Sequence, residues 1–235
     1  MRGSQKLTSP GQPSVDSRRE HPNALSDQDL VFALGHELGN LIGAVRLHAH
    51  LLDDDMTPTG LAQASVDLDD LSARSAALLG LIRPLLTPQT RSPETLPVSV
   101  LMGNLKRPLT ALGGRGTKLR FELDSELVAV RIDVGVIQRL IESFFFLAID
   151  STAGRGEIVI RAEPRGDRIA LCIEDDGPGG EDPAGFRDQA MRGRPLLCAV
   201  ADVILPRQGG DFEVTRMDDR TRIVLILPAV PLPAR

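Results

Sequence analysis

Apolar residues recur at helical spacing in two long segments near the start of the chain. In the first segment they lie mostly three or four residues apart, at Leu30, Leu34, Leu38, Leu41, Val45 and Leu52. Ser26 precedes them as a candidate N-cap with acidic residues in the first turn, so we predict a helix over residues 26–53. In the second segment the positions alternate steps of three and four, at Leu61, Ala64, Leu68, Leu71, Ser75, Leu78, Ile82 and Leu85. This heptad pattern predicts a second helix over residues 59–86.

The two predicted helices are joined by a short turn and should form an antiparallel hairpin. A hairpin alone cannot cover both apolar stripes, so the stripes must pack against something else. We predict that the hairpins of two chains pair as a four-helix bundle, which makes the protein a homodimer. The alternative is that the hairpin packs against the C-terminal part of its own chain.

The pattern changes after a linker at residues 87–97, which contains three prolines. Beyond it, alternating runs predict strands at residues 118–123, 128–132, 157–163, 169–174, 212–216 and 222–227, and helical patterns cover residues 98–112, 134–150 and 196–205. Helices and mostly antiparallel strands in this order predict an α/β sandwich over residues 98–228, with helices on one face of a single sheet. The whole chain is therefore expected to be α+β, with tails at residues 1–25 and 229–235.

Composition and charge exclude several function classes. The net charge is -5, and Trp and Tyr are absent, so the chain offers neither a basic groove nor a stacking platform for nucleic acid. The longest apolar stretch, residues 144–149, is far shorter than the roughly 18 residues of a membrane span, and no signal-peptide pattern opens the sequence. Cys172 and Cys198 lack metal-ligand spacing. We therefore predict a cytoplasmic protein without nucleic-acid, membrane or metal binding.

His36 is the candidate reactive residue of the chain. Since successive helical residues turn by about 100°, it lies nearly opposite the stripe of Leu34 and Leu38 and should face solvent. Glu37 and Asn40 lie on the same polar patch. A neutral imidazole can attack a phosphoryl group to form a phosphoramidate, and a neighbouring carboxylate can keep one ring nitrogen protonated. Glu37 fits that orienting role, and Asn40 is placed to bind a phosphoryl oxygen or to position a water.

The residues around His36 form the stretch Phe32-Ala33-Leu34-Gly35-His36-Glu37-Leu38-Gly39-Asn40-Leu41-Ile42-Gly43-Ala44-Val45. It resembles the phosphoacceptor box of two-component sensor histidine kinases, which has a His-Glu-Leu-x-Asn core, an aliphatic stripe and a paired second helix. The resemblance implies that His36 carries a phosphoryl group. Leu41 departs from the pattern, which usually has Pro there, so the helix is expected to lack the usual bend.

Residues 98–228 resemble the ATP-binding domain of the same kinases, a GHKL-like domain. The segment Ile173-Glu174-Asp175-Asp176-Gly177-Pro178-Gly179-Gly180 is similar to the family's D-x-G-x-G box. By that resemblance Asp175 would accept a hydrogen bond from the adenine amino group, and Gly177 and Gly179 would let the backbone approach the base. The alternative is an ordinary Asp-Gly-Pro-Gly turn after a strand.

Other positions depart from the family's nucleotide-binding pattern. Ser143 and Leu147 stand where two asparagines are expected, and the second of these normally supplies an oxygen ligand to Mg²⁺. Pro195 and Leu197 stand where glycines would cradle the phosphates. Phosphoryl transfer from ATP relies on the metal to neutralise phosphate charge. The resemblance therefore implies a degenerate ATP-binding domain that uses no nucleotide and no metal.

A helical hairpin with a reactive histidine and a degenerate ATP domain together resemble the dimeric histidine phosphotransferases of bacterial phosphorelays, of the ChpT type. The resemblance implies that His36 shuttles a phosphoryl group between receiver-domain aspartates, with response regulators or the receiver of a hybrid kinase as partners. One alternative is an ATP-dependent histidine kinase or response-regulator phosphatase that binds Mg-ATP through Asp175. Another is a non-catalytic protein that only binds receivers.

Overall fold

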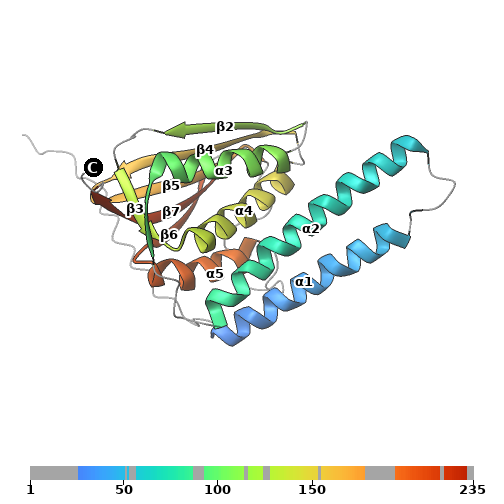
Figure 1. Ribbon diagram of the computed structural model, residues 1–235, viewed down its shortest axis with the longest axis horizontal. Helices are drawn as coiled ribbons and strands as arrows, with labels where there is room; N and C mark the ends of the chain where they lie inside the picture. Colours follow the sequence, from blue (N-terminus) through green and yellow to red (C-terminus); the bar gives the residue numbers. More distant parts are fainter. Residues whose placement is uncertain are drawn as a thin grey trace, which may run out of the picture.

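The computed structural model describes residues 26–50, 52, 57–86, 93–113, 116–123, 128–152, 155–177, 194–217 and 220–231. The described chain has two parts, a hairpin of two long helices and an α/β domain built on a seven-stranded sheet (Figure 1). The predicted N-terminal tail lies outside the described residues.

The hairpin consists of α1 (Asp27–His50) and α2 (Pro58–Leu86). At the start of α1, the Ser26 hydroxyl accepts the Asp29 N–H at 3.2 Å, and the Ser26 N–H donates back to the Asp29 carboxylate at 3.1 Å. Two orphan donors of the first turn are thus satisfied reciprocally. The hydrogen bonds from Ser26 also lower the pKa of Asp29. At the start of α2, the Thr57 hydroxyl accepts the Gly60 N–H at 3.2 Å in the same capping role.

By length and composition, α1 is the one helix in the described part of the chain that could cross a membrane. This helix has no long uninterrupted apolar stretch, because charged and polar residues are spread along it, so the sequence pattern did not indicate a membrane span. Its Leu30 and Leu34 are buried in the core of the protein, and its other residues are half-buried or exposed. The cytoplasmic location stays a prediction.

The sheet has the strand order β1-β3-β7-β5-β4-β2, with β6 paired to β7. The strands are β1 (Glu94–Pro97), β2 (Lys118–Leu123), β3 (Val128–Ile132), β4 (Glu157–Arg165), β5 (Arg168–Asp175), β6 (Asp211–Met217) and β7 (Arg220–Pro231). Only β2 and β4 pair in parallel among the described strands. The first part of β7 lies between β5 and β6, and its end pairs with β3, so this one long strand connects both halves of the sheet.

Two ends of the predicted domain differ in the structure. The last four residues of the predicted linker form β1, which pairs antiparallel with β3. We did not predict this strand, because four residues are too few to show a period. At the other end, β7 continues to Pro231, into the residues expected to be a tail.

Three helices, α3 (Val98–Leu112), α4 (Val134–Ser151) and α5 (Arg194–Arg207), cover one face of the sheet (Figure 1). Phe144 and Phe145 of α4 are fully buried, and Phe144 stacks on Phe212 with ring centroids 5.3 Å apart. Half of the residues of α4 are buried, because the helix lies between the sheet and α2, while Arg139 and Asp150 remain exposed at its edge.

The hairpin packs against the α/β domain of its own chain along part of its length. The buried leucines at this junction belong to the same core cluster as α4 and α5; they are Leu30, Leu34, Leu78, Leu81 and Leu85. The far ends of both hairpin helices project beyond the domain (Figure 1). For this part of the apolar stripes, the hairpin thus packs against the C-terminal part of its own chain, which was the alternative to the dimer. The four-helix bundle of two chains stays a prediction.

Two arginines fasten this junction at different places. Arg74 of α2 donates from both Nη atoms to the two carboxylate oxygens of Asp150 on α4, at 2.7 and 2.8 Å. Arg207 of α5 pairs with Asp27 at the start of α1 and donates to the Pro84 carbonyl at 2.9 Å. Each end of the docked segment is therefore held by charge-assisted hydrogen bonds, which are stronger than neutral ones.

Candidate functional site

His36 lies on α1 with an exposed side chain, whereas Leu34, two residues earlier, is fully buried. The helix therefore divides as its apolar pattern predicts, with the imidazole on the solvent side. The ring is accessible to a large partner because it lies outside the contact between the hairpin and the domain.

Asn40 links the polar residues of this patch. Its Nδ2 atom lies 3.4 Å from His36 Nδ1 and 3.4 Å from Glu37 Oε2. The contact to the ring that we expected from Glu37 is thus made by Asn40, and Glu37 contacts Asn40 rather than the ring. An amide N–H that donates to Nδ1 leaves the ring proton on Nε2. Attack through Nε2 uses the tautomer with the proton on Nδ1, which the amide oxygen of Asn40 could accept with the amide group turned over. Contacts this long rearrange at small cost.

Three glycines follow one another at every fourth position beside His36, at Gly35, Gly39 and Gly43. All three are exposed, and a Cβ atom added at any of them would meet nothing within 4 Å. Glycine in an exposed helix interior costs about 1 kcal/mol relative to alanine. Packing within the described chain gives no reason for these glycines.

We expect Gly39→Ala to stabilise the protein by about 0.5–1 kcal/mol, because it adds helix propensity without a clash. The free energy of urea-induced unfolding measures the change. The matched control is Gly177→Ala, whose added Cβ would lie 2.5 Å from the Ser151 carbonyl and should destabilise the fold. A loss of stability in Gly39→Ala would show that this face of α1 is covered.

The candidate adenine-binding residues lie at the end of β5. Asp175 is buried, and its Oδ1 atom accepts the Gly177 N–H at 3.3 Å. Gly177 packs directly against Ser151 at the end of α4, so glycine is required there by the close approach of the loop to the helix. Gly179 lies outside the described residues. The structure thus brings Asp175 and Gly177 together and places both apart from the His36 patch, on another element.

A cavity of about 140 Å³ lies between the hairpin and the domain. The hairpin lines it with Glu37, Leu41, Arg74 and Leu78. The domain lines it with Ser143, Phe146, Leu147, Asp150, Leu196 and Leu197. Positions that the family resemblance assigns to metal and phosphates therefore form one mostly apolar wall, and Glu37 connects this cavity to the His36 patch. No group of three or more potential metal-ligating side chains occurs among the residues that the structure describes.

Arg74 is the residue at this cavity that the sequence did not single out. Its Nε atom donates to Asp70 at 2.8 Å, and its guanidinium lies 4.9 Å from the centroid of the Phe146 ring. Burial lowers the pKa of Arg74, but Asp150 and Asp70 outweigh burial and raise it above the ordinary value. The spacing of Asp70 and Arg74 was visible in the sequence, whereas the partner 76 residues away was not.

We expect Arg74→Ala to lower the free energy of unfolding by about 1–2 kcal/mol, because it leaves Asp150 unpaired and removes the cover of Phe146. Arg165→Ala is the control. Arg165 pairs with Glu213 at 2.9 Å with both side chains about half exposed, and such pairs contribute about 0.5 kcal/mol or less. Chemical denaturation of both variants makes the comparison. Equal losses would mean that Arg74 does not fasten the junction.

An antiparallel helical hairpin docked on an α/β domain of this topology is a histidine kinase-like fold. The chain is similar to the Acinetobacter baumannii histidine kinase AdeS, with a TM-score of 0.57 and 18% identity over 82% of this chain and 97% of that one. It is also similar to histidine kinase ThkA in complex with response regulator protein TrrA, with a TM-score of 0.57 and 16% identity over 86% of this chain and 62% of that chain.

A third similar structure is full-length ShkA in complex with AMPPNP, with a TM-score of 0.55 and 16% identity over 89% of this chain and 47% of that one. No protein-family model and no curated protein matches the sequence. Likeness at these identities establishes the fold, which hosts more than one activity. The predicted α+β architecture, a helical hairpin followed by a GHKL-like domain, is confirmed at this level.

Proposed function

We propose that this protein is a histidine phosphotransfer protein, which passes a phosphoryl group between receiver-domain aspartates through His36. The observation that carries the proposal is the combination of an exposed imidazole on an open helix face with leucines where phosphates and metal would bind. The histidine kinase-like fold supports it, and the complex of ThkA with a response regulator supports receivers as the partners. We further propose that the protein is cytoplasmic.

The proposed chemistry has two steps. In the first, an unprotonated ring nitrogen of His36 attacks the phosphorus of the donor's aspartyl phosphate. The N–P bond forms, the O–P bond breaks, and the donor carboxylate leaves with the electron pair. In the second, the acceptor carboxylate attacks the same phosphorus and the ring nitrogen leaves with its electron pair. The other ring nitrogen keeps its proton throughout, with Asn40 beside it.

The fold family implies Mg-ATP, but the described residues do not fit its phosphate and metal end. Leu147 and Leu197 offer no oxygen to a hard cation, and Ser143 offers a single buried hydroxyl. A cavity of about 140 Å³ lined mainly by leucines would also leave phosphate charges without partners. We therefore derive no step through a nucleotide.

The alternative function is a histidine kinase or response-regulator phosphatase that still binds nucleotide. It is favoured by Asp175 and Gly177, which keep the close turn at the end of β5. Radiolabelled ATP and a radiolabelled phosphorylated receiver, each incubated with the protein, separate the functions. We expect label from the receiver and none from ATP. Label from ATP would establish a kinase, and label from neither would leave only receiver binding.

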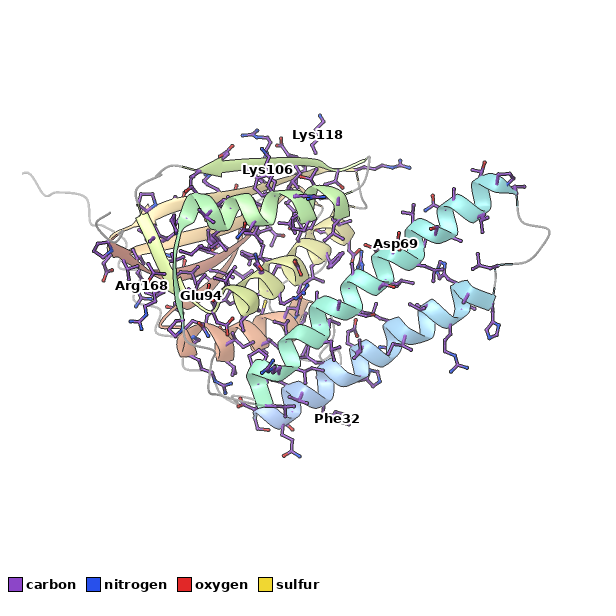
Figure 2. The ribbon with its side chains drawn as sticks, viewed as in Figure 1. Phe32, Asp69, Glu94, Lys106, Lys118 and Arg168 are labelled. Atoms are coloured by element: carbon purple, nitrogen blue, oxygen red, sulfur yellow. The ribbon has the colours of Figure 1, made fainter. Side chains whose placement is uncertain are left out.

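We also propose that the protein is a homodimer through the outer face of the hairpin. Leu61 and Leu79 lie about five turns apart on the same side of α2, with Leu86 close to their line, and all three are exposed. Phe32 is 78% exposed on the outer side of α1, away from the domain (Figure 2). Exposed apolar patches of this kind mark association surfaces.

We expect wild-type protein to sediment as a dimer and Leu79→Glu to sediment as a monomer at the same concentration. A charge at this position would be desolvated in the interface but costs little on the exposed face of a single chain. Sedimentation velocity over a range of concentrations measures the change. The control is Ala62→Glu, because Ala62 is also exposed but lies about 100° around α2 from the line of Leu61 and Leu79. A monomeric wild type at high concentration would contradict the dimer.

A further inference from the structure

We propose that the cavity between the hairpin and the α/β domain binds a small, uncharged, mainly apolar molecule that carries one hydrogen-bonding group. The cavity is lined by residues of α1, α2, α4 and α5. Because both parts of the chain contribute to its walls, the site is complete only when the hairpin is docked. The proposal concerns binding and does not depend on the chemistry of His36.

Ser143 supplies the polar contact of this site. The residue lines the cavity, is only 3% exposed, and its hydroxyl has no hydrogen-bond partner in the described structure. Buried hydroxyl groups are nearly always hydrogen-bonded, because an unpaired one has lost its hydration without replacement. A ligand that brings one donor or acceptor into the cavity would satisfy this hydroxyl.

Size and lining define the rest of the ligand. The volume of about 140 Å³ is close to that of an engineered, enclosed apolar cavity of about 150 Å³ that binds benzene, and the cavity of this protein is in addition open to solvent on one side. Among the described residues that line the cavity, five leucines and Phe146 are the majority, which favours a single ring or a short branched chain.

The lining disfavours both a negatively and a positively charged ligand. The Arg74 guanidinium is already bonded to Asp150 and Asp70, and the Glu37 carboxylate at the wall would repel an anion. The leucines would leave a cation desolvated. A neutral molecule about the size of phenol matches all of these constraints.

Binding at this site stabilises the docked arrangement of the hairpin. A molecule that binds the docked state and not the undocked state shifts the population toward docking by mass action. The site therefore couples the concentration of a small molecule to the position of α1, the helix that carries His36.

Phenol and toluene are the probes that test the proposal, because they share a shape and differ in a hydroxyl against a methyl group. The full chain is titrated with each while leucine methyl signals are followed by NMR. We expect both to bind, with phenol the tighter. Ser143→Ala should weaken phenol about fivefold, the effect of one neutral hydrogen bond, and leave toluene unchanged.

Two filling variants locate the site. Leu147→Phe fills the cavity from the domain and Leu41→Phe fills it from the hairpin, and each should abolish binding of both probes. Val66→Ala, which is 61% exposed on α2 and lies outside both the cavity lining and the proposed dimer surface, should leave both affinities unchanged. Circular dichroism confirms folding, and if one filling variant does not fold, the other decides. Failure of both probes to bind at millimolar concentration overturns the proposal, as does binding that survives the filling variants.

Discussion

Replacing His36 with alanine is expected to abolish phosphoryl transfer from a phosphorylated receiver, by at least about a thousandfold. Removal of the attacking nucleophile costs at least this much in enzymes that work through covalent intermediates. Glu37 and Asn40 cannot take over, because neither offers an imidazole nitrogen to form the phosphoramidate. The measurement is radiolabel on the protein after incubation with a labelled receiver, with the acid lability of the label identifying a phosphohistidine.

His48→Ala is the matched control for this experiment. His48 lies on the same helix, is half-buried, and its Nδ1 lies 3.8 Å from an oxygen of Asp67. It has no neighbour set like that of His36, so its replacement should leave transfer within about twofold. Full labelling of His36→Ala would assign the phosphoryl group to another residue and sink the proposed function. Loss of labelling in both variants would point to damaged helix structure instead.

The patch around His36 could be predicted because helix geometry alone fixes it. Residues four apart on a helix are neighbours, so the contact between His36 and Asn40 follows from the sequence. The capping residues Ser26 and Thr57 are equally local, since each bonds to a residue three positions on. The sequence did not predict which of the two neighbours contacts the imidazole ring, which in the structure is Asn40 and not Glu37.

The junction between hairpin and domain could not be predicted in the same way. Arg74 meets Asp150 across 76 residues of chain, and this contact depends on how two separately patterned parts dock. The heptad pattern of α2 predicted an apolar stripe, but it did not predict that α4 packs against it. Part of that stripe is buried against α4, whereas its first residue, Leu61, remains exposed.

The altered nucleotide positions acquire a structural reason in the folded chain. In the sequence, Leu147 and Leu197 are read only as lost nucleotide-binding residues. Leu147 cannot replace the asparagine that would bind the metal, and Leu197 cannot replace the glycine that would bind phosphate. In the structure both line the cavity between the hairpin and the domain; Leu197 is buried in the core cluster, and Leu147 is half-buried. A polar side chain in place of Leu197 would be buried without a partner while the hairpin is docked. Nucleotide binding would favour polar or small residues at this side of the cavity, whereas packing of the docked hairpin favours apolar ones.

The docked hairpin leads to the second large effect, which is on stability. We expect Leu81→Ala to lower the free energy of unfolding by about 2–5 kcal/mol, because it deletes a fully buried side chain from the core. Leu81 is 0% exposed and belongs to the core cluster that joins α2 to the α/β domain, in which α4 is the main element against α2. An independent hairpin would expose more of this side chain and lose less on its truncation. Urea denaturation followed by circular dichroism measures the difference.

Leu79→Ala makes the matched comparison, since it removes the same atoms from the same helix two residues away. Leu79 is 57% exposed, so its truncation should change stability by about 0.5 kcal/mol or less in the single chain. A larger loss that grows with protein concentration would show that Leu79 is buried by a second copy, as the proposed dimer requires. Equal, small losses of stability in both variants would mean that the hairpin is not docked in solution. The cavity between hairpin and domain would then not exist, and the proposed ligand site would be wrong.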